Sequence, residues 1–329
     1  MGFKLGNTHL RHGLLLAPMA GYSDRAMRVI ASELGAELSV TEMVSAKAVT
    51  FGDKKTFSLA RIRKDEGNVS LQIFGSEPDI MARAAAELER GYGGEDYASP
   101  ISIDINMGCP VNKIFGNGEG SALMRDPELI YRITRAVSDN ISIPVTVKLR
   151  SGIDAKSINA VECALAAEQG GAAMVTVHGR TRTMLYSGNA DRDIIRKVKN
   201  SLHIPVVANG DITDAPSALS MLSETGADGI MIGRGAVGNP YIFAEIKAAL
   251  EGGTFATPSL EEKKVTALRQ LALAIEDKGE RVAVPEARRQ IAVYFKGFRG
   301  SAALRASINS ALTYGEVESA LSELEDEKI

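Results

Sequence analysis

The chain of 329 residues contains only two cysteines, four histidines and no tryptophan. The two cysteines, Cys109 and Cys163, are too few for a disulfide framework or a multi-cysteine zinc site, and the scarcity of histidine argues against a histidine-based metal centre. No run of about 18 apolar residues exists that would span a bilayer. The first residues, Met1 to Asn7, lack the apolar segment of a signal peptide. We therefore expect a cytoplasmic protein that uses neither a membrane nor a metal.

An excess of charge of one sign is also missing. The chain has 38 basic and 41 acidic residues, and a net charge of -3 by itself indicates no polyanionic partner. With 45% hydrophobic and 24% charged residues, the composition is globular and excludes a disordered, collagen-like or coiled-coil chain. One segment differs: between Arg281 and Arg305, six basic residues accompany a single acid, Glu286. This segment is either a polyanion-binding face or a solvated helix surface.

Short apolar runs recur along the first 250 residues, and each is followed by a stretch with helical spacing. Such continuous hydrophobicity is typical of parallel strands that are buried on both faces. Eight strand–helix units in about 250 residues predict a (β/α)8 barrel. A doubly wound open sheet is the alternative, but the residues after the first run, 17–21, lack its nucleotide-binding glycine pattern. The predicted strands are Leu14–Ala17, Leu38–Val44, Val69–Phe74, Ile101–Asn106, Pro144–Leu149, Met174–Val177, Pro205–Ala208 and Gly229–Ile232.

A second unit follows the barrel pattern, which ends near Leu250. Residues 251–258 contain two glycines and a proline and are typical of a linker. Ser259, with Glu262 three residues later, predicts a helix that begins with a capping box. From there the pattern is helical almost to the end. The sequence therefore predicts a barrel over residues 1–250 and a small helical domain over 259–329.

Polar or reactive residues follow almost every predicted strand, and in (β/α)8 barrels the catalytic groups lie at these strand ends. After the seventh strand comes Asn209-Gly210-Asp211, and after the eighth comes Gly233-Arg234. Glycine turns at these two positions frequently bind phosphate. A single such turn can also be purely structural, but the pair predicts a cofactor that carries a phosphate.

Lys148 lies within an apolar strand, where a lysine is unfavourable without an anionic partner. The N1–C2=O edge of a reduced flavin is one such partner, and Gln72, which both donates and accepts, suits another polar edge of the ring. The alternative for Lys148 is an ion pair with Glu42 or Asp104. For His178 the alternative to a ligand contact is a hydrogen-bonded core histidine.

Cys109 lies on a turn between Gly108 and Pro110 rather than inside a helix or strand. A thiol on a turn at the barrel rim can act as an acid or a nucleophile. Most lone cysteines are buried small hydrophobic residues, as we expect for Cys163 in its apolar helical stretch. A hydrolytic cysteine–histidine pair would have to recruit His178 from another strand.

Together these segments closely resemble the bacterial tRNA-dihydrouridine synthases, especially their B-type subfamily. The resemblance covers the barrel and extends weakly into the helical domain, where Arg289, Gln290 and Val293 depart from the lysine, histidine and tryptophan that family members often carry. The segments that carry it are Leu16–Gly21, Asp104–Pro110, Val177–Arg182, Ala208–Ile212 and Met231–Arg234.

The resemblance implies an FMN-dependent enzyme that reduces the C5–C6 double bond of uridines in tRNA with hydride from NADPH. It implies tRNA as the partner, and we expect no obligate protein partner. Cys109 would be the general acid and Asn106 would contact the uracil. The flavin would be bound along its ring by Pro18, Met19 and Ala20, at its polar edges by Gln72, Lys148 and His178, and at its phosphate by Asn209, Gly210, Asp211, Gly233 and Arg234. The tRNA would be contacted by Arg150, Arg180 and Arg182 at the rim and by Arg288 and Arg289 on the basic helices.

Two other functions remain compatible with the barrel. One is an FMN-dependent oxidoreductase that acts on a free pyrimidine or another small molecule, such as a dihydropyrimidine or dihydroorotate dehydrogenase, but it would not need the basic helices. The other is a non-catalytic RNA-binding protein, against which the retained Cys109 argues.

Overall fold

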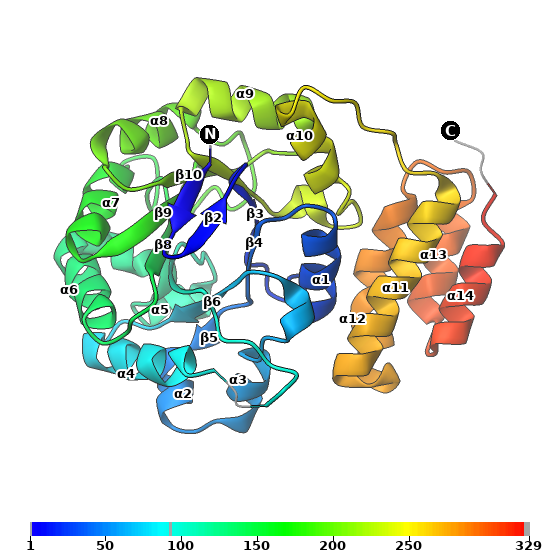
Figure 1. The fold of residues 1–329 in the computed structure, drawn as a ribbon, viewed down its shortest axis with the longest axis horizontal. Helices are drawn as coiled ribbons and strands as arrows, with labels where there is room; N and C mark the ends of the chain where they lie inside the picture. The colour runs from blue at the N-terminus through cyan, green and yellow to red at the C-terminus, as the bar shows by residue number, and fades with distance from the viewer. Residues whose placement is uncertain (1, 92–93, 326–329) are drawn as a thin grey trace.

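A closed barrel of parallel strands forms the larger part of the protein (Figure 1). The strands are β3 Leu14–Leu16, β4 Leu38–Val40, β5 Val44–Ser45, β6 Val69–Phe74, β7 Ser102–Met107, β8 Val145–Arg150, β9 Ala172–His178, β10 Val206–Asn209 and β11 Gly229–Ile232. The computed structural model describes residues 2–91 and 94–325. Barrel neighbours follow the order of the chain, and β11 pairs with β3 to close the cylinder. The predicted (β/α)8 fold is therefore confirmed.

The second barrel strand is interrupted. Residues 41–43 have no regular structure, so β4 and β5 pair separately with β6, at Val69 and Ser70 and again at Ile73 and Phe74. The sequence predicted one continuous strand here because apolar residues flank the break on both sides. The break leaves the Glu42 carboxylate free to accept a hydrogen bond from the Gly21 N–H of the preceding loop.

Helices cover the outside of the barrel, and the main core lies between them and the outward-facing side chains of the strands. They are α1 Arg25–Glu33, α2 Ala46–Thr50, α3 Lys54–Leu59, α4 Pro78–Glu89, α6 Pro127–Ser138, α7 Ala160–Gln169, α8 Arg192–Ser201, α9 Ala215–Thr225 and α10 Ile242–Leu250. Local sequence explains the bounds of α9. The Asp214 carboxylate accepts from Ser217 N at its start, and Gly226 ends it with a left-handed φ of +67°.

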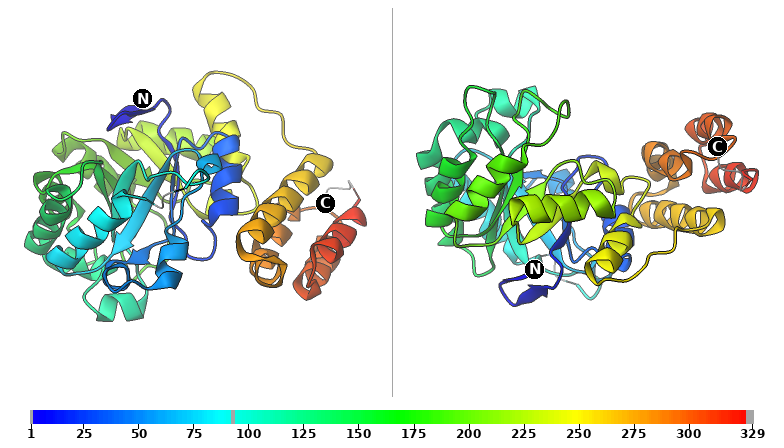
Figure 2. Two further views of the ribbon diagram at one scale, coloured as in Figure 1. Left: turned by 60° about the horizontal axis from the view of Figure 1, so that its bottom comes forward. Right: turned by 90° about the horizontal axis from the view of Figure 1, so that it is seen from above.

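An antiparallel hairpin, β1 Phe3–Leu5 and β2 Thr8–Leu10, covers the N-terminal end of the barrel. Leu5 and Leu10 pack there against inward-facing strand residues such as Leu15 and Met231. In Figure 2 (right) the hairpin lies at one end of the barrel and the loop that follows β9 lies at the other. We did not predict this hairpin, although a Gly-Asn pair between two short alternating segments is a hairpin signal. The hairpin leaves the C-terminal end of the barrel as its mouth.

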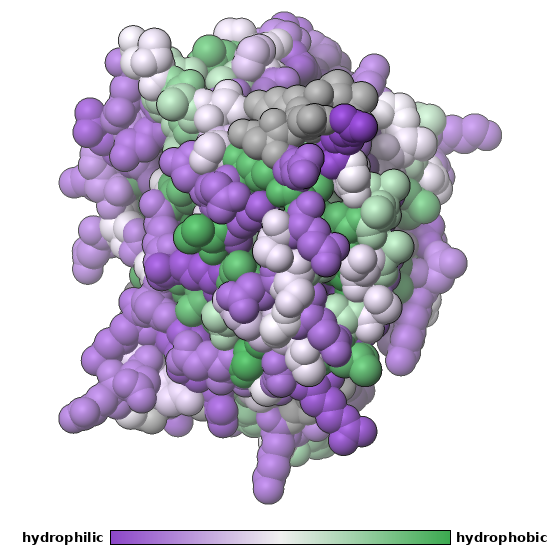
Figure 3. All heavy atoms as spheres, turned by 90° about the vertical axis from the view of Figure 1, so that its right-hand side faces the viewer, coloured by the Kyte–Doolittle hydropathy of each residue, from purple (hydrophilic) through white to green (hydrophobic). Residues whose placement is uncertain are grey.

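The C-terminal helices form a second core beside the barrel, built around Tyr294, Phe295 and Phe298. These helices are α11 Leu260–Lys278, α12 Glu280–Ile291, α13 Ser301–Ser310 and α14 Tyr314–Ser322. The predicted capping box is present: Ser259 Oγ accepts from Glu262 N at 3.2 Å, and Glu262 Oε2 accepts from Ser259 N at 2.7 Å. Hydrophilic and hydrophobic side chains are mixed on the face that this domain turns away from the barrel (Figure 3).

The helical domain is attached to the barrel by ion pairs at the α1 side. Lys278 Nζ lies 2.7 Å from Asp24 Oδ2, and Arg63 Nη1 lies 2.9 Å from Glu276 Oε1. The pair of Lys278 with Asp24 and Glu286 raises the pKa of its ammonium group, although its burial acts in the opposite direction. Within residues 2–91 and 94–325, no helix is both long and apolar enough to cross a membrane.

Candidate active site

The barrel interior has a polar half and an apolar half. On β7, inward-facing Ser102, Asp104 and Asn106 alternate with apolar residues that pack against the helices. The opposite side of the interior is lined by apolar residues such as Leu15 and Val40, which pack together with the hairpin. The polar half is lined by Ser70, Gln72, Ser102, Asp104, Asn106, Thr146, Lys148, Thr176, His178 and Asn209. This polar half leads to the mouth, where the sequence places its reactive residues.

A chain of hydrogen bonds crosses three strands of the polar half. Thr146 Oγ1 donates to Asp104 Oδ1 at 2.5 Å, and Gln72 Nε2 donates to Asp104 Oδ2 at 2.7 Å. Asn106 Nδ2 in turn donates to Gln72 Oε1 at 2.8 Å. Strand register makes the chain possible, because Gln72, Asp104 and Thr146 lie directly opposite one another. Burial raises the pKa of Asp104 even though these hydrogen bonds and the charge of Lys148 act against the change.

Cys109 lies on a turn that begins where β7 ends, and its backbone is held from two sides. Asn106 Oδ1 accepts from Cys109 N at 2.9 Å and from Gly108 N at 3.2 Å. Ser121 Oγ donates to Cys109 O at 2.7 Å. The thiol is 9% exposed, and burial raises its pKa although a hydrogen bond from Val111 N and the charge of Arg150 act against this. At neutral pH the sulfur therefore keeps its proton.

Lys148 and His178 lie on neighbouring strands of the polar half. Lys148 Nζ donates to Asn209 Oδ1 at 3.0 Å, and burial, with a contribution from the Arg150 charge, lowers its pKa to about 8. Among the described residues Lys148 forms no ion pair, so the alternative pairing with Glu42 or Asp104 is absent there. Burial and the nearby positive charges lower the pKa of His178 to about 2, so its ring is neutral.

Arg150 and Arg180 hold the loops of the mouth together. Arg150 Nε donates to Gly108 O at 2.8 Å, and its Nη1 donates to Thr181 O at 2.9 Å, so it ties the Cys109 turn to the loop after β9. Burial lowers the pKa of Arg150 to about 10. Arg180 is 2% exposed and forms an ion pair of 2.7 Å with Asp211. Both were predicted as substrate contacts, and both use most of their donors within the protein.

The two predicted glycine turns adjoin each other at the ends of β10 and β11. Asp211 has a left-handed φ of +52°, and its carboxylate accepts from Ala190 N at 2.7 Å besides pairing with Arg180. Burial would raise the pKa of Asp211, but these partners lower it. Gly210 has a φ of +129°, which other residues rarely adopt. Arg234 is exposed and lies over the Tyr186 ring, 4.4 Å from its centroid.

The loop after β3 carries the remaining predicted flavin contacts, Pro18, Met19 and Ala20, which are half-buried or exposed at the mouth. Ser23 Oγ accepts from Met19 N at 2.8 Å and so holds the loop in a turn. From the helical domain, Arg289 reaches this loop: its Nη2 donates to Gly21 O at 3.1 Å.

The other arginines predicted to contact tRNA are separated. Arg182 lies at the mouth, 3.7 Å from the centroid of the Phe115 ring. Arg289 lies over Tyr22 at 4.7 Å, at the junction of the two domains. Arg288 instead donates from Nε to Ala311 O at 3.0 Å, where it satisfies a carbonyl at the end of α13. Arg182 and Arg289 thus adjoin barrel loops, and Arg288 is occupied inside the helical domain.

Three residues that hold the site were not predicted to do so: Asp104, Thr146 and Ser121. A signal for the first two was present, because polar residues at every second position of β7 and β8 indicate a polar inner face.

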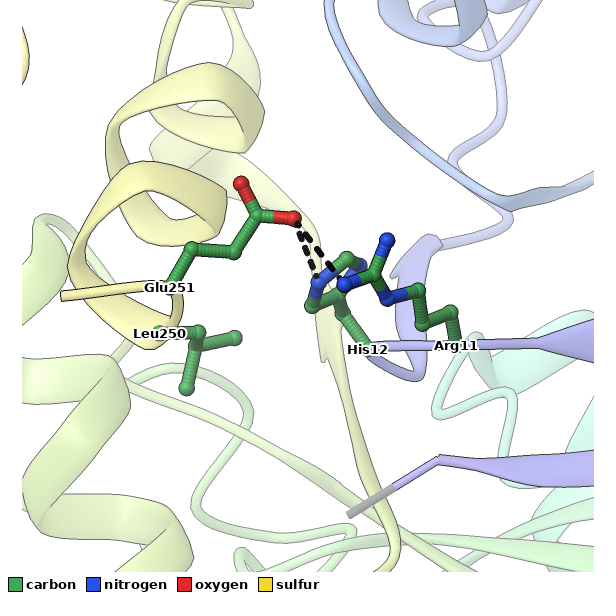
Figure 4. A pocket seen from close by; sticks show the side chains of 4 residues that line it. All are labelled: Arg11, His12, Leu250 and Glu251. Atoms are coloured by element: carbon green, nitrogen blue, oxygen red, sulfur yellow. Dashed lines mark ion pairs between the residues drawn. The ribbon is translucent and has the colours of Figure 1, made fainter. Parts of the chain in front are cut away.

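Away from the mouth, Arg11, His12, Leu250 and Glu251 line a cleft in which Glu251 pairs with both Arg11 and His12 (Figure 4). Arg11 and His12 lie between β2 and β3, and Leu250 and Glu251 lie at the end of α10, so the cleft is separate from the candidate site. Among the described residues, no cluster of His, Cys, Asp and Glu could hold a metal ion.

A closed parallel barrel with a thiol and buried cationic groups at the C-terminal strand ends defines an enzyme of the (β/α)8 class. Within that class, residues 15–328 match the model of the dihydrouridine synthase family. The chain therefore belongs to the dihydrouridine synthase family, which confirms the resemblance found in the sequence.

Individual relatives agree with this assignment. The chain is 40% identical over 308 residues to a probable tRNA-dihydrouridine synthase of Rickettsia conorii, covering 93% of this chain and 91% of that protein. It is 40% identical over 310 residues to tRNA-dihydrouridine synthase B of Pseudomonas putida, covering 93% and 89%. The solved structure of histamine dehydrogenase from Rhizobium sp. 4-9 matches with a TM-score of 0.54 at 13% identity, over 83% of this chain and 50% of that one. At 13% identity this last similarity shows the barrel fold alone, and the chain spans half the length of that protein.

Proposed function

We propose that this protein is an FMN-dependent tRNA-dihydrouridine synthase, which reduces the C5–C6 double bond of uridines in tRNA with NADPH as the reductant, in the cytoplasm. Family membership and the names of the relatives support the substrate class. One structural observation carries the chemistry: Cys109, a thiol that burial keeps protonated, lies at the same end of the barrel as Lys148, a half-buried cation that forms no ion pair among the described residues.

The residues at the mouth fit FMN. Lys148 lacks an anionic partner among the described residues, and the buried Nη1 atom of Arg180 has no hydrogen-bond partner there. Both observations favour a ligand that brings acceptor atoms and negative charge. Gln72, Lys148 and His178 would hold the polar edges of the ring. The phosphate would lie against Asn209, Gly210, Asp211, Gly233 and Arg234.

When bound, FMN supplies the hydride for C6 of the uracil. Cys109 then donates its proton to C5, which suits a thiol whose raised pKa keeps it protonated until negative charge develops nearby. Asn106 uses its carbonyl for the Cys109 turn and one N–H for Gln72, so its second N–H remains to contact the uracil. His178, neutral at physiological pH, can serve as a hydrogen-bond donor or acceptor without adding charge.

We propose that residues 1–250 form the catalytic barrel, that 259–329 bind tRNA, and that 251–258 link them. A uridine must leave the tRNA stack to enter the mouth, as in other base-modifying enzymes. Arg182 and Arg289, which lie over aromatic rings beside the mouth, are placed to contact the phosphate backbone around it.

The test is to map dihydrouridine in tRNA from cells that lack this protein, and from the same cells that carry either the wild-type gene or Cys109→Ala. We expect specific positions to lose dihydrouridine and only the wild-type gene to restore it. Unchanged dihydrouridine in the deletion strain would overturn the proposal. Purified protein that reduces free uracil or oxidises dihydroorotate, but does not act on tRNA, would favour the small-molecule oxidoreductase instead.

A further inference from the structure

We propose that Asp104 is a positioning residue. From its place in the polar half it fixes which way the side-chain amides of Gln72 and Asn106 face, and through these hydrogen bonds it holds the turn that carries Cys109. The consequence for turnover rests on the proposed function, whereas the effect on the thiol itself does not. The hydrogen-bonded chain consists of Asp104, Gln72, Asn106 and the backbone of Cys109.

One end of this chain is fixed by the backbone. The N–H groups of Gly108 and Cys109 can only donate, so the atom that faces them must be an acceptor. That atom is Asn106 Oδ1, at 3.2 and 2.9 Å. The amide nitrogen of Asn106 must then face Gln72, where it donates to Oε1 at 2.8 Å.

The other end is fixed by a carboxyl group. Asp104 Oδ2 accepts from Gln72 Nε2 at 2.7 Å, so the Gln72 amide cannot turn over without placing its oxygen against this acceptor. Thr146 faces the other oxygen, Oδ1, at 2.5 Å. If Asp104 takes up a proton, the proton fits between Oδ1 and Thr146, and Oδ2 remains an acceptor. The ionised Asp104 therefore requires the same orientation of both amides as the backbone end does, and the protonated Asp104 is compatible with it.

The hydrogen-bonded side chains have little access to water that could replace a lost hydrogen-bond partner. Gln72 and Asp104 are each 1% exposed, and Asn106 is 7% exposed. Removing the acceptor at Asp104 leaves a buried Gln72 N–H unsatisfied, or lets the amide turn over and face Asn106 with the wrong atom. Either outcome weakens the hydrogen bonds by which Asn106 holds the Cys109 turn.

The first experiment measures alkylation of Cys109 by iodoacetamide in the purified protein, by mass spectrometry of its peptide. We expect Asp104→Leu to accelerate alkylation about tenfold, the effect of one lost buried hydrogen bond. Asp104→Asn should instead keep an alkylation rate close to that of the wild type, because its side-chain oxygen can accept from Gln72 while its nitrogen donates to Thr146. Cys163 is fully buried and serves as the internal control for global unfolding.

A matched control lies one layer deeper on the same strand. Ser102 Oγ donates to Ser70 Oγ at 2.8 Å, and this buried pair has no link to Asn106. Ser102→Ala removes a buried hydrogen bond from β7 and should leave alkylation of Cys109 unchanged. Equal acceleration in Ser102→Ala and Asp104→Leu would show a merely structural role and overturn the proposal.

A second pair of variants moves the carboxylate along the chain. In Asn106→Asp the new oxygen faces Gln72, whose amide must turn over and then presents its own oxygen to Asp104, a contact that Asp104 can satisfy only by taking up a proton on Oδ2. We expect about tenfold faster alkylation. In the double variant Asp104→Asn with Asn106→Asp, the nitrogen at position 104 donates to the reversed Gln72, and every bond is restored. Alkylation of the double variant as fast as that of Asn106→Asp would refute the directional chain.

Turnover provides a separate measurement. For Asp104→Leu we expect kcat to fall about tenfold while KM for tRNA is unchanged, because the acid moves but the RNA contacts do not. A higher KM for tRNA with an unchanged kcat would contradict the positioning role. A wild-type protein without turnover of tRNA would sink the proposed function, and the alkylation results would still decide the role of Asp104.

Discussion

Replacing Lys148 by methionine should stabilise the ligand-free protein and abolish the FMN binding that we propose. Methionine has a similar length and no charge, so it suits the enclosed part of the polar half. In the wild type, burial of the ammonium group lowers the pKa of Lys148 from 10.5 to about 8. The native state therefore holds this proton less firmly than the unfolded chain does, and the charge destabilises the fold wherever Lys148 is protonated.

The magnitude follows from this difference. At about 1.36 kcal/mol for each pH unit between 10.5 and about 8, the charge destabilises the native state by about 3 kcal/mol at pH 7. Loss of the hydrogen bond to Asn209 opposes this by about 1 kcal/mol, which leaves the variant more stable by about 2 kcal/mol. Above pH 8 Lys148 is mostly neutral in the native state. In the unfolded state it stays mostly charged until the pH approaches 10.5, so the difference between the two states shrinks as the pH rises. The destabilisation falls to about 1 kcal/mol at pH 9.5, and the advantage of the variant falls to about zero.

The assay is urea unfolding of flavin-free protein at pH 7 and pH 9.5, with flavin absorbance measured separately after reconstitution. The control is Lys199→Met, because Lys199 lies on the outside of the barrel and pairs with Asp228 at 2.6 Å. The same substitution there removes a satisfied ion pair and should lower stability. A Lys148→Met variant that is less stable than the wild type at pH 7, or whose advantage does not shrink at pH 9.5, would refute the reasoning.

Three further predictions concern chemistry and tRNA binding. Cys109→Ala should keep its flavin absorbance and lose nearly all turnover of tRNA in single-turnover assays; full activity would mean that another group donates the proton. Because the pKa of His178 is lowered to about 2, kcat measured from pH 5 to 8 should show no limb near 6.5, and a limb that disappears in His178→Asn would contradict this. Arg289→Glu should weaken tRNA binding severalfold and flatten its salt dependence in filter-binding assays. Arg288→Glu should instead lower the melting temperature, since Arg288 holds Ala311; the reverse pattern would contradict both assignments.

The barrel was predictable because its strands are short, apolar and regularly spaced, and these patterns follow from burial on both faces. The break at Thr41, Glu42 and Met43 was not, because apolar residues flank these two polar residues and Met43, and the same pattern can belong to a continuous strand. The hairpin was also missed. Phe3–Leu5 is only three residues long, and its burial depends on covering a barrel end that the local sequence does not describe.

At the site, the sequence predicted which residues reach the mouth but not which of them touch. Contacts such as that of Gln72 with Asp104 depend on strand register, which joins residues far apart in the chain. The roles of the arginines depend on tertiary contacts as well. Arg150 and Arg288 look alike in sequence as basic residues near a predicted RNA surface, yet each donates to carbonyl groups of the protein itself.

The division of the barrel interior explains how the fold tolerates such a site. Among the residues that the structure describes, the polar half holds Lys148 without an ion pair and a buried Thr176 hydroxyl without a hydrogen-bond partner, and Arg180 at the mouth has a buried Nη1 atom that is also unpaired. The apolar half, sealed by the hairpin, supplies the close packing that offsets them. An anionic ligand that enters the polar half supplies the missing acceptors, so its binding energy adds directly to the stability of the folded state. Removing polar groups from this half would therefore stabilise the empty protein and weaken the same ligand, which is why a more stable barrel would be a poorer enzyme.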